Sequence, residues 1–158
     1  MSTTQLSTAT ADARDEFLDN LRQMATGSYL RDEDREFWEA PYPESAVDEA
    51  QQIVDGMLQA AQTVAAGDEA ELKKIAATLN LQNSDESADE QPNATTLAVT
   101  AVVIQHVTKL KELSARHEDA LLEDEEIKDL LALVEKLAVD LDADDMFVTS
   151  QAEAVCEA

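Results

Sequence analysis

Hydrophobic positions recur at helical spacing through most of this chain. Within residues 10–26, 45–66 and 124–141, apolar side chains return every three to four positions, and polar side chains lie between them. This period places the apolar side chains on one face of a helix. The pattern predicts three amphipathic helices, and Ser45 is placed as the capping residue of the second.

The composition of the segments between these helices indicates their structure. Asp68 followed by Glu71 is typical of a capped helix start, so we expect residues 45–80 to form a helical hairpin. Residues 82–92, QNSDESADEQP, are acidic and contain no large apolar side chain, so we expect a flexible acidic linker there. The polar residues 1–9, which are rich in Ser and Thr, are expected to be disordered.

The stretch 97–113 is apolar on nearly every side. Its β-branched run over residues 99–104 also fits a buried strand. We favour a helix because the apolar spacing continues through Leu110 and Leu113 and no partner strand is evident. All-round hydrophobicity places such a helix in the centre of a bundle or in a subunit interface. The residues expected to self-associate in the second case are Leu97, Val103, Ile104, Val107 and Leu110.

These elements together predict an all-α fold, a bundle of about five or six helices joined as antiparallel hairpins. We expect a single domain over residues 10–143, in which the halves 10–80 and 93–143 pack together across the linker. Residues 144–158 are expected to form an acidic tail or one short helix.

Aromatic residues gather in one short segment between the first two long helices. Pro41 and Pro43 require extended backbone there, so the segment is expected to be an irregular connector. Its aromatic side chains either pin the connector onto the bundle or contact a partner. Pinning is the commoner use, but this is where we expect a binding surface, with two scarce positive charges nearby. The residues concerned are Tyr29, Arg31, Arg35, Phe37, Trp38 and Tyr42.

The chain is strongly acidic, with 35 Asp and Glu against 11 Lys and Arg and a net charge of -24. Such a surface repels nucleic-acid phosphates and anionic membranes, so we expect neither as a direct partner. Three interpretations stay open: adaptation to salt, attraction of a basic partner, or a solvated surface with no specific use. The last is the commonest.

Alternating aspartates at residues 140, 142 and 144 have the spacing of the first ligands of a calcium loop. However, Asp145 stands where that loop requires glycine, and Gln151 stands where it requires a bidentate glutamate. From Asp140, Asp142 and Asp144 we therefore expect weak, nonspecific binding of divalent cations at most.

No other pattern places catalytic groups together, and we expect no cofactor. His106 lies beside apolar positions and is interpreted as a core-edge histidine. Cys156 has acidic neighbours that disfavour its thiolate. As the only cysteine, it permits no intrachain disulfide, and residues 1–15 have no apolar core of a signal peptide, so we expect a cytoplasmic protein.

The sequence thus predicts a noncatalytic helical interaction protein. It would associate with itself, as a homodimer, or bind a protein partner through the apolar helix face and the aromatic connector. The alternative is an acidic decoy or inhibitor that presents carboxylates to a basic or nucleic-acid-binding protein. An enzyme or metal-binding protein without a readable motif ranks third.

Overall fold

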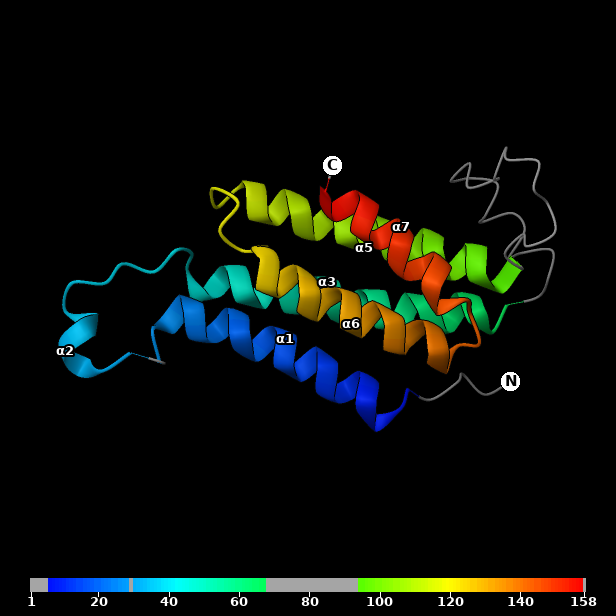
Figure 1. The fold of residues 1–158 in the computed structure, drawn as a ribbon, viewed down its shortest axis with the longest axis horizontal. Helices are drawn as coiled ribbons and strands as arrows, with labels where there is room; N and C mark the ends of the chain where they lie inside the picture. Colours follow the sequence, from blue (N-terminus) through cyan, green and yellow to red (C-terminus); the bar gives the residue numbers. More distant parts are fainter. Residues whose placement is uncertain (1–5, 29, 68–93, 158) are drawn as a thin grey trace.

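The computed structural model describes residues 6–28, 30–67 and 94–157, and these form an all-helical bundle (Figure 1). The helices are α1 (Thr8–Thr26), α2 (Asp32–Arg35), α3 (Glu44–Ala65), α5 (Ala94–Ala115), α6 (Asp124–Asp140) and α7 (Asp145–Glu157). The prediction of an all-α fold is therefore confirmed. Residues 99–104 lie inside α5, so the strand alternative for them is wrong.

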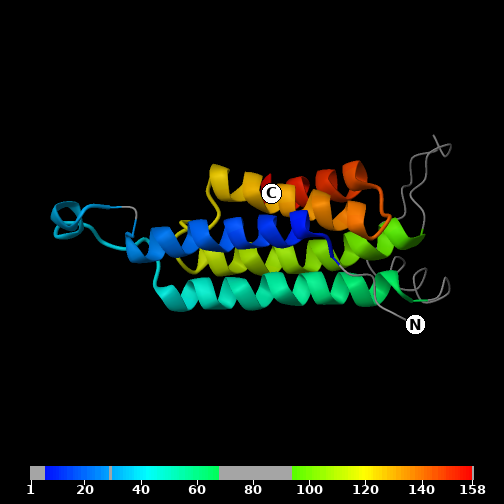
Figure 2. The ribbon, with the colours of Figure 1, turned by 90° about the horizontal axis from the view of Figure 1, so that it is seen from below.

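The five long helices of the described residues form a closed ring around one core. Each packs mainly against two others, in the order α1, α3, α5, α7, α6 and back to α1. Helices that follow one another in the chain run in opposite directions along the elongated bundle (Figures 1 and 2). Segments from either side of residues 68–93 therefore pack directly on each other, α1 on α6 and α3 on α5.

Helix α1 begins earlier than its apolar pattern suggests. The Ser7 hydroxyl oxygen accepts a hydrogen bond from the Thr10 backbone N–H at 3.3 Å, and Leu6 packs against the core. Helix α1 therefore starts at Thr8, inside the segment 1–9 that was expected to be disordered, because a serine before the first helical residue satisfies a free backbone N–H. Residues 1–5 lie outside the described residues.

Helix α3 is preceded by a proline and not by the predicted serine cap. Pro43 has extended backbone and makes no side-chain capping hydrogen bond, and Ser45 lies exposed in the first turn. The Ser45 prediction was wrong because Pro43 fixes the extended residue from which the helix starts. The predicted helix after Asp68 and the predicted linker over residues 82–92 lie outside the described residues.

Helix α5 is buried on most of its sides. Two of its threonines, Thr96 and Thr100, are also buried, and the Thr100 hydroxyl donates to the Thr96 carbonyl oxygen at 2.7 Å. The uniform hydrophobicity of the helix is explained by neighbours on several sides, α3, α7 and α6. Across the described ranges no helix is both long enough and apolar enough to cross a membrane.

The C-terminal segment forms a helix that completes the ring. Asp144 precedes α7, and its carboxylate accepts a hydrogen bond from the Phe147 backbone N–H at 3.2 Å. Val148 and Ala152 are buried, and Lys111 of α5 donates to the Val155 carbonyl oxygen at 2.8 Å. Residues 145–157 therefore belong to the packed bundle and do not form a free tail.

Candidate interaction surfaces

The connector, defined here as residues 27–43, leaves α1 at a glycine. Gly27 has a φ of 69°, and its backbone N–H donates to the Gln23 carbonyl oxygen at 2.8 Å. A Cβ on Gly27 would lie 2.8 Å from Trp38 Cζ3, closer than atoms can pack. The left-handed backbone and the nearby indole ring both require glycine here. Trp38 is thus packed against the end of α1.

A second aromatic residue fixes the other end of the connector. Tyr42 is only 2 % exposed, and its hydroxyl donates to the Leu21 carbonyl oxygen of α1 at 3.1 Å. Buried tyrosines usually find such a partner for the hydroxyl group. Trp38 and Tyr42 therefore pin the connector, as aromatic residues in such segments most often do.

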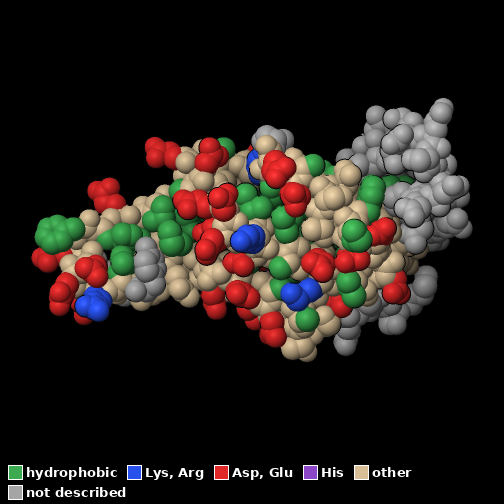
Figure 3. Space-filling view, in the orientation of Figure 1, with side chains coloured by type: hydrophobic (Ala, Val, Ile, Leu, Met, Phe, Trp, Pro, Cys, Tyr) green, Lys and Arg blue, Asp and Glu red, His purple; other side chains and the backbone are tan. Residues whose placement is uncertain are grey.

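Between Gly27 and Trp38, which lie against each other, the connector projects from the bundle. Phe37 is 90 % exposed, and Arg31 is also exposed. The segment around α2 stands away from the long helices in both ribbon views, and hydrophobic side chains appear at its far end (Figures 1, 2 and 3). Tyr29 and the side chain of Arg35 lie outside the described residues. Among the described aromatic residues of the predicted surface, Phe37 is the one whose side chain is largely exposed to solvent.

The predicted self-association residues of α5 are largely taken up by the core. Val103, Val107 and Leu110 have no exposed surface, and Leu97 and Ile104 are half-buried. Helices α3, α6 and α7 of the same chain pack around α5, so these side chains are covered without a second copy. Three members of the set therefore have no exposed surface to offer a second copy, and self-association itself stays a prediction.

Each of the three aspartates with calcium-loop spacing has a different structural role. The Asp140 carboxylate accepts hydrogen bonds from the Ser7 backbone N–H, at 2.8 Å, and from the Thr10 hydroxyl. Asp142 is exposed in a left-handed turn, and Asp144 caps α7. Throughout the described part of the chain, no group of three His, Cys, Asp or Glu side chains is placed to hold a metal ion.

The histidine and the cysteine that the sequence offered have different neighbours in the described structure. His106 Nδ1 lies 2.7 Å from the Val102 carbonyl oxygen, and its ring lies against Gly56 of α3. Burial raises the pKa of the Cys156 thiol, although the Lys111 charge opposes the effect. A thiol with a raised pKa is a poor nucleophile at neutral pH.

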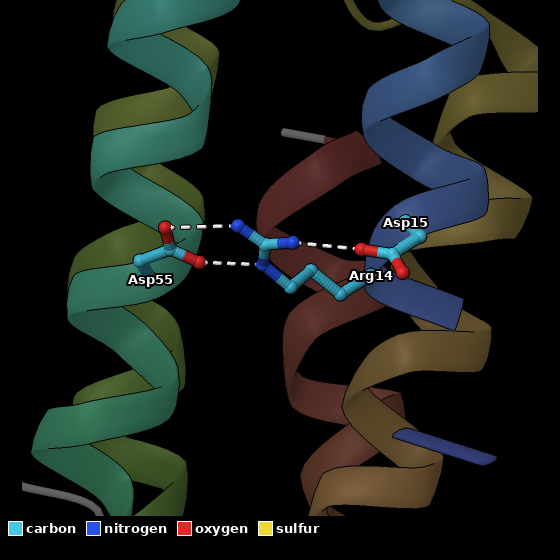
Figure 4. A network of polar contacts seen from close by, with 3 residues as sticks. All are labelled: Arg14, Asp15 and Asp55. Atoms are coloured by element: carbon cyan, nitrogen blue, oxygen red, sulfur yellow. Dashed lines mark hydrogen bonds and ion pairs between the residues drawn. The ribbon is translucent and has the colours of Figure 1, made fainter. Parts of the chain in front are cut away.

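Arginines join α1 and the end of α5 to α3. Arg14 of α1 makes a two-point contact with the Asp55 carboxylate, at 2.6 and 3.0 Å, and also reaches Asp15 at 2.7 Å (Figure 4). The partners of Arg22 and Arg116 are likewise carboxylates of α3, at 3.2 and 3.1 Å. The acidic face of α3 is thus partly neutralised by cations of its neighbours.

The contact of α1 with α6 lacks such arginines and leaves a groove. We call it the α1–α6 groove: three hollows of about 260, 150 and 490 Å³, lined by residues from the ranges 9–24 and 119–136. Asp129 is shared by the first two hollows, and Met24 is shared by the second and third. Among the described lining residues, eight are Asp or Glu, and Lys136 is the basic one.

Glu126 is the most deeply buried carboxylate of this groove. It is 7 % exposed and lines two of the three hollows. Burial raises its pKa, and the charges of Glu123, Asp129 and Glu125 add to the effect; a hydrogen bond from its own backbone N–H opposes it. In the described structure no basic side chain pairs with this carboxylate.

Sequence reasoning did not find the α1–α6 groove. Acidic residues at the start of α6 were visible, but they also suit the positive end of a helix dipole and gave no distinct signal. The groove depends on α6 lying beside α1, more than a hundred residues away in the chain. Only that pairing brings the carboxylates of both helices together.

Comparisons with protein-family models, with curated proteins and with solved structures find no match for this chain.

Proposed function

We propose that this protein is a noncatalytic interaction protein that binds a protein partner through the projecting connector, with Phe37 as the central contact. The observation that carries the proposal is the 90 % exposure of Phe37 directly before two anchored aromatic residues, Trp38 and Tyr42. Large aromatic side chains supply much of the binding energy in protein interfaces. An anchored segment also loses less conformational entropy on binding than a free one.

The neighbouring charges fit the same role. Arg31 and the carboxylates of α2 are exposed around Phe37 and provide a polar rim. A separate candidate, self-association through α5, has lost most of its support because Val103, Val107 and Leu110 are buried in the core. The acidic-decoy hypothesis draws support from a different surface, the α1–α6 groove.

Photo-cross-linking from the connector tests the proposal. A photoreactive phenylalanine derivative at position 37 is expected to capture a discrete partner in cells of origin, which mass spectrometry identifies. The same derivative at position 146 is the matched control, because Met146 is 79 % exposed on a different element. The captured partner is then purified and titrated against the Phe37→Ser and Met146→Ser variants.

We expect Phe37→Ser to weaken binding of the purified partner by about tenfold or more, as for a central aromatic contact, and Met146→Ser to leave it nearly unchanged. Equal capture from positions 37 and 146, or a partner that binds the Phe37→Ser variant as tightly as the original protein, would contradict the proposal. Light scattering on the purified protein separately measures self-association.

A further inference from the structure

Helix α7 covers one side of the apolar helix α5 and is the least buried of the long described helices. Two of its thirteen residues, Val148 and Ala152, are buried, whereas α6 has six buried residues among seventeen. Helix α5 packs mainly against α3 and α7. Release of α7 would therefore expose one side of α5, whose side chains are apolar on nearly every side.

A buried hydroxyl group in α7 weakens the attachment of this helix. The Oγ1 atom of Thr149 is buried and has no hydrogen-bond partner in the described structure. By contrast, three threonines in other helices donate to the carbonyl oxygen four residues earlier: Thr26, Thr63 and Thr100, at 2.9, 2.9 and 2.7 Å. A buried polar group without a partner opposes folding because it has lost its hydration. Helix α7 therefore docks less tightly than its apolar residues alone would allow.

The α6–α7 hinge, defined here as residues 141–144, is short and contains an unfavourable backbone conformation. Asp142 has a φ of 57°, in the left-handed region that residues with a Cβ disfavour. The hinge begins at a fixed point, because the Asp140 carboxylate accepts hydrogen bonds from Ser7 and Thr10 at the start of α1. Helix α7 runs back along α6 from this point (Figure 1). Helical backbone at Asp142 would instead continue α6 in its own direction and carry α7 away from α5.

We propose that α7 is exchanged between two copies of this chain: the α6–α7 hinge straightens, and α7 of each copy packs against α5 of the other. A second copy is the partner because its α7 fits the uncovered side of α5 as closely as the chain's own α7 does. The exchange also gives α5, which is covered within one chain, a route to the self-association that its sequence suggested. The proposal does not depend on Phe37 or on the connector.

The balance between monomer and exchanged dimer depends on the hinge and on charge, because the exchange keeps the contacts of α7. Straightening removes the left-handed conformation of Asp142, which favours the dimer. Two chains of net charge -24 repel each other, which favours the monomer until salt screens the repulsion. We therefore expect a monomer at low salt and a dimer fraction that grows with protein concentration at about 0.5 M NaCl.

Two substitutions at one position test the hinge by light scattering behind a sizing column at about 0.5 M NaCl. Asp142→Ala disfavours the left-handed backbone and should raise the dimerisation constant by about fivefold or more, since each dimer contains two hinges. Asp142→Gly removes the same charge but favours the left-handed backbone, so it should lower the constant by a similar factor. Thermal melts check that both variants fold.

A disulfide identifies the chain that supplies α7. Lys111 of α5 and Cys156 of α7 line one hollow, and Lys111 Nζ donates to the Val155 carbonyl oxygen at 2.8 Å. On oxidation, the Lys111→Cys variant should therefore form a disulfide with Cys156, within one chain in the monomer and between chains in the exchanged dimer. Denaturing gels without reductant separate the two products. Lys109→Cys, at an exposed position outside this hollow, is the matched control and should give much less linked dimer.

Hydrogen exchange followed by mass spectrometry measures the release of α7 in the monomer. The backbone N–H groups of α7 should exchange faster than those of α6. Thr149→Val removes the unpaired hydroxyl group and should slow exchange in α7 by about threefold or more. Thr63→Val on α3 is the matched control and should leave exchange in α7 unchanged, because the Thr63 hydroxyl is exposed and already bonded.

Three results would each overturn the inference. The first is a strict monomer for both the original protein and Asp142→Ala at all concentrations and salts. The second is a dimer of the Lys111→Cys variant that contains no disulfide between chains. The third is exchange in α7 that is as slow as exchange in α6. None of these results bears on partner capture from position 37, so failure here is distinguishable from failure of the proposed function.

Discussion

Helix α1 packs against two long neighbours, and the two contacts are built differently. Along α3, Arg14 and Arg22 pair with Asp55 and Asp48 (Figure 4). Along α6, the polar contacts are uncharged donors on carboxylates, such as Asn20 Nδ2 to Asp129 Oδ2 at 2.7 Å. Helix α1 is therefore joined to α3 by ion pairs. Its contact with α6 depends on the buried core, and the surface above that contact carries mainly carboxylates.

This difference shows how a strongly acidic chain uses its few cations. The face visible in Figure 3 carries many acidic side chains and few basic ones. Arginines that bridge helices stabilise the bundle, whereas the charge left along α6 opposes close packing at the surface. The unneutralised side is consequently the one with a groove and with a buried carboxylate, Glu126.

The largest expected effect is a loss of stability when a large side chain is removed from the core beneath both contacts. Phe17 of α1 has no exposed surface, so Phe17→Ala should lower the free energy of unfolding by about 3–5 kcal/mol, measured by urea denaturation. Phe37→Ala is the matched control and should change it by less than about 0.5 kcal/mol because Phe37 is exposed. A loss below about 1 kcal/mol for Phe17→Ala would mean that α1 is not held by this core.

The next largest expected effect is a gain in stability. Glu126→Gln should raise the free energy of unfolding at neutral pH by about 1 kcal/mol, because it removes a buried charge that lies near three others. The measurement is urea denaturation of the original protein and the variant in the same buffer. A destabilised variant would show that the Glu126 charge has a partner after all.

The pH dependence follows from the direction of the Glu126 shift. Its folded-state pKa lies above the ordinary value of 4.5, so the folded chain binds more protons than the unfolded chain between the two values. This group therefore adds stability as pH falls through that window and removes it as pH rises. The advantage of Glu126→Gln should shrink as the pH is lowered toward 4.5, and an advantage independent of pH would contradict the assignment.

The same type of change on the α3 side should destabilise the fold. Asp55→Asn removes the two-point ion pair with Arg14, and we expect a loss of about 0.5–1 kcal/mol at low salt. The value is modest because the Asp55 side chain is 45 % exposed and solvent screens the pair. If Asp55→Asn and Glu126→Gln changed the free energy of unfolding in the same direction, the contrast between the two sides of α1 would be contradicted.

The smallest effect is a response to salt. The melting temperature should rise by a few degrees between about 0.02 and 0.2 M NaCl, because salt screens repulsion within a chain of net charge -24. A variant with Glu123→Gln, Glu125→Gln and Glu126→Gln together should show a smaller rise in melting temperature with salt than the original protein. A flat or falling curve for the original protein would show that self-repulsion does not limit its stability.

Local sequence patterns were most informative where one side chain decides the structure. Gly27 ends α1 in a left-handed conformation, which glycine adopts at helix ends more readily than other residues. Ser45 misled because Pro43 and Ser45 are both typical of helix starts, and the backbone restriction of the proline prevailed. For residues 144–158, the pattern could not separate a tail from a helix because the apolar positions Val148 and Ala152 matter only once α5 and α6 lie beneath them.

The candidate surfaces were only partly predictable for a similar reason. The aromatic segment was visible in the sequence, but the pattern could not tell that Trp38 and Tyr42 face inward while Phe37 faces solvent. Likewise, the apolar run of α5 fitted both a core and an interface between copies. In each case hydrophobicity shows that burial is favourable but does not identify the surface that provides it.

The sequence by itself determined the all-α class, the main helices and the acidic character of the surface, because helical period and charge are properties of neighbouring residues. Only the tertiary structure decided the order of helices around the ring, the exposure of Phe37 and the meeting of α1 with α6 over Glu126. These depend on contacts between residues far apart in the chain, which the period of any single helix does not encode.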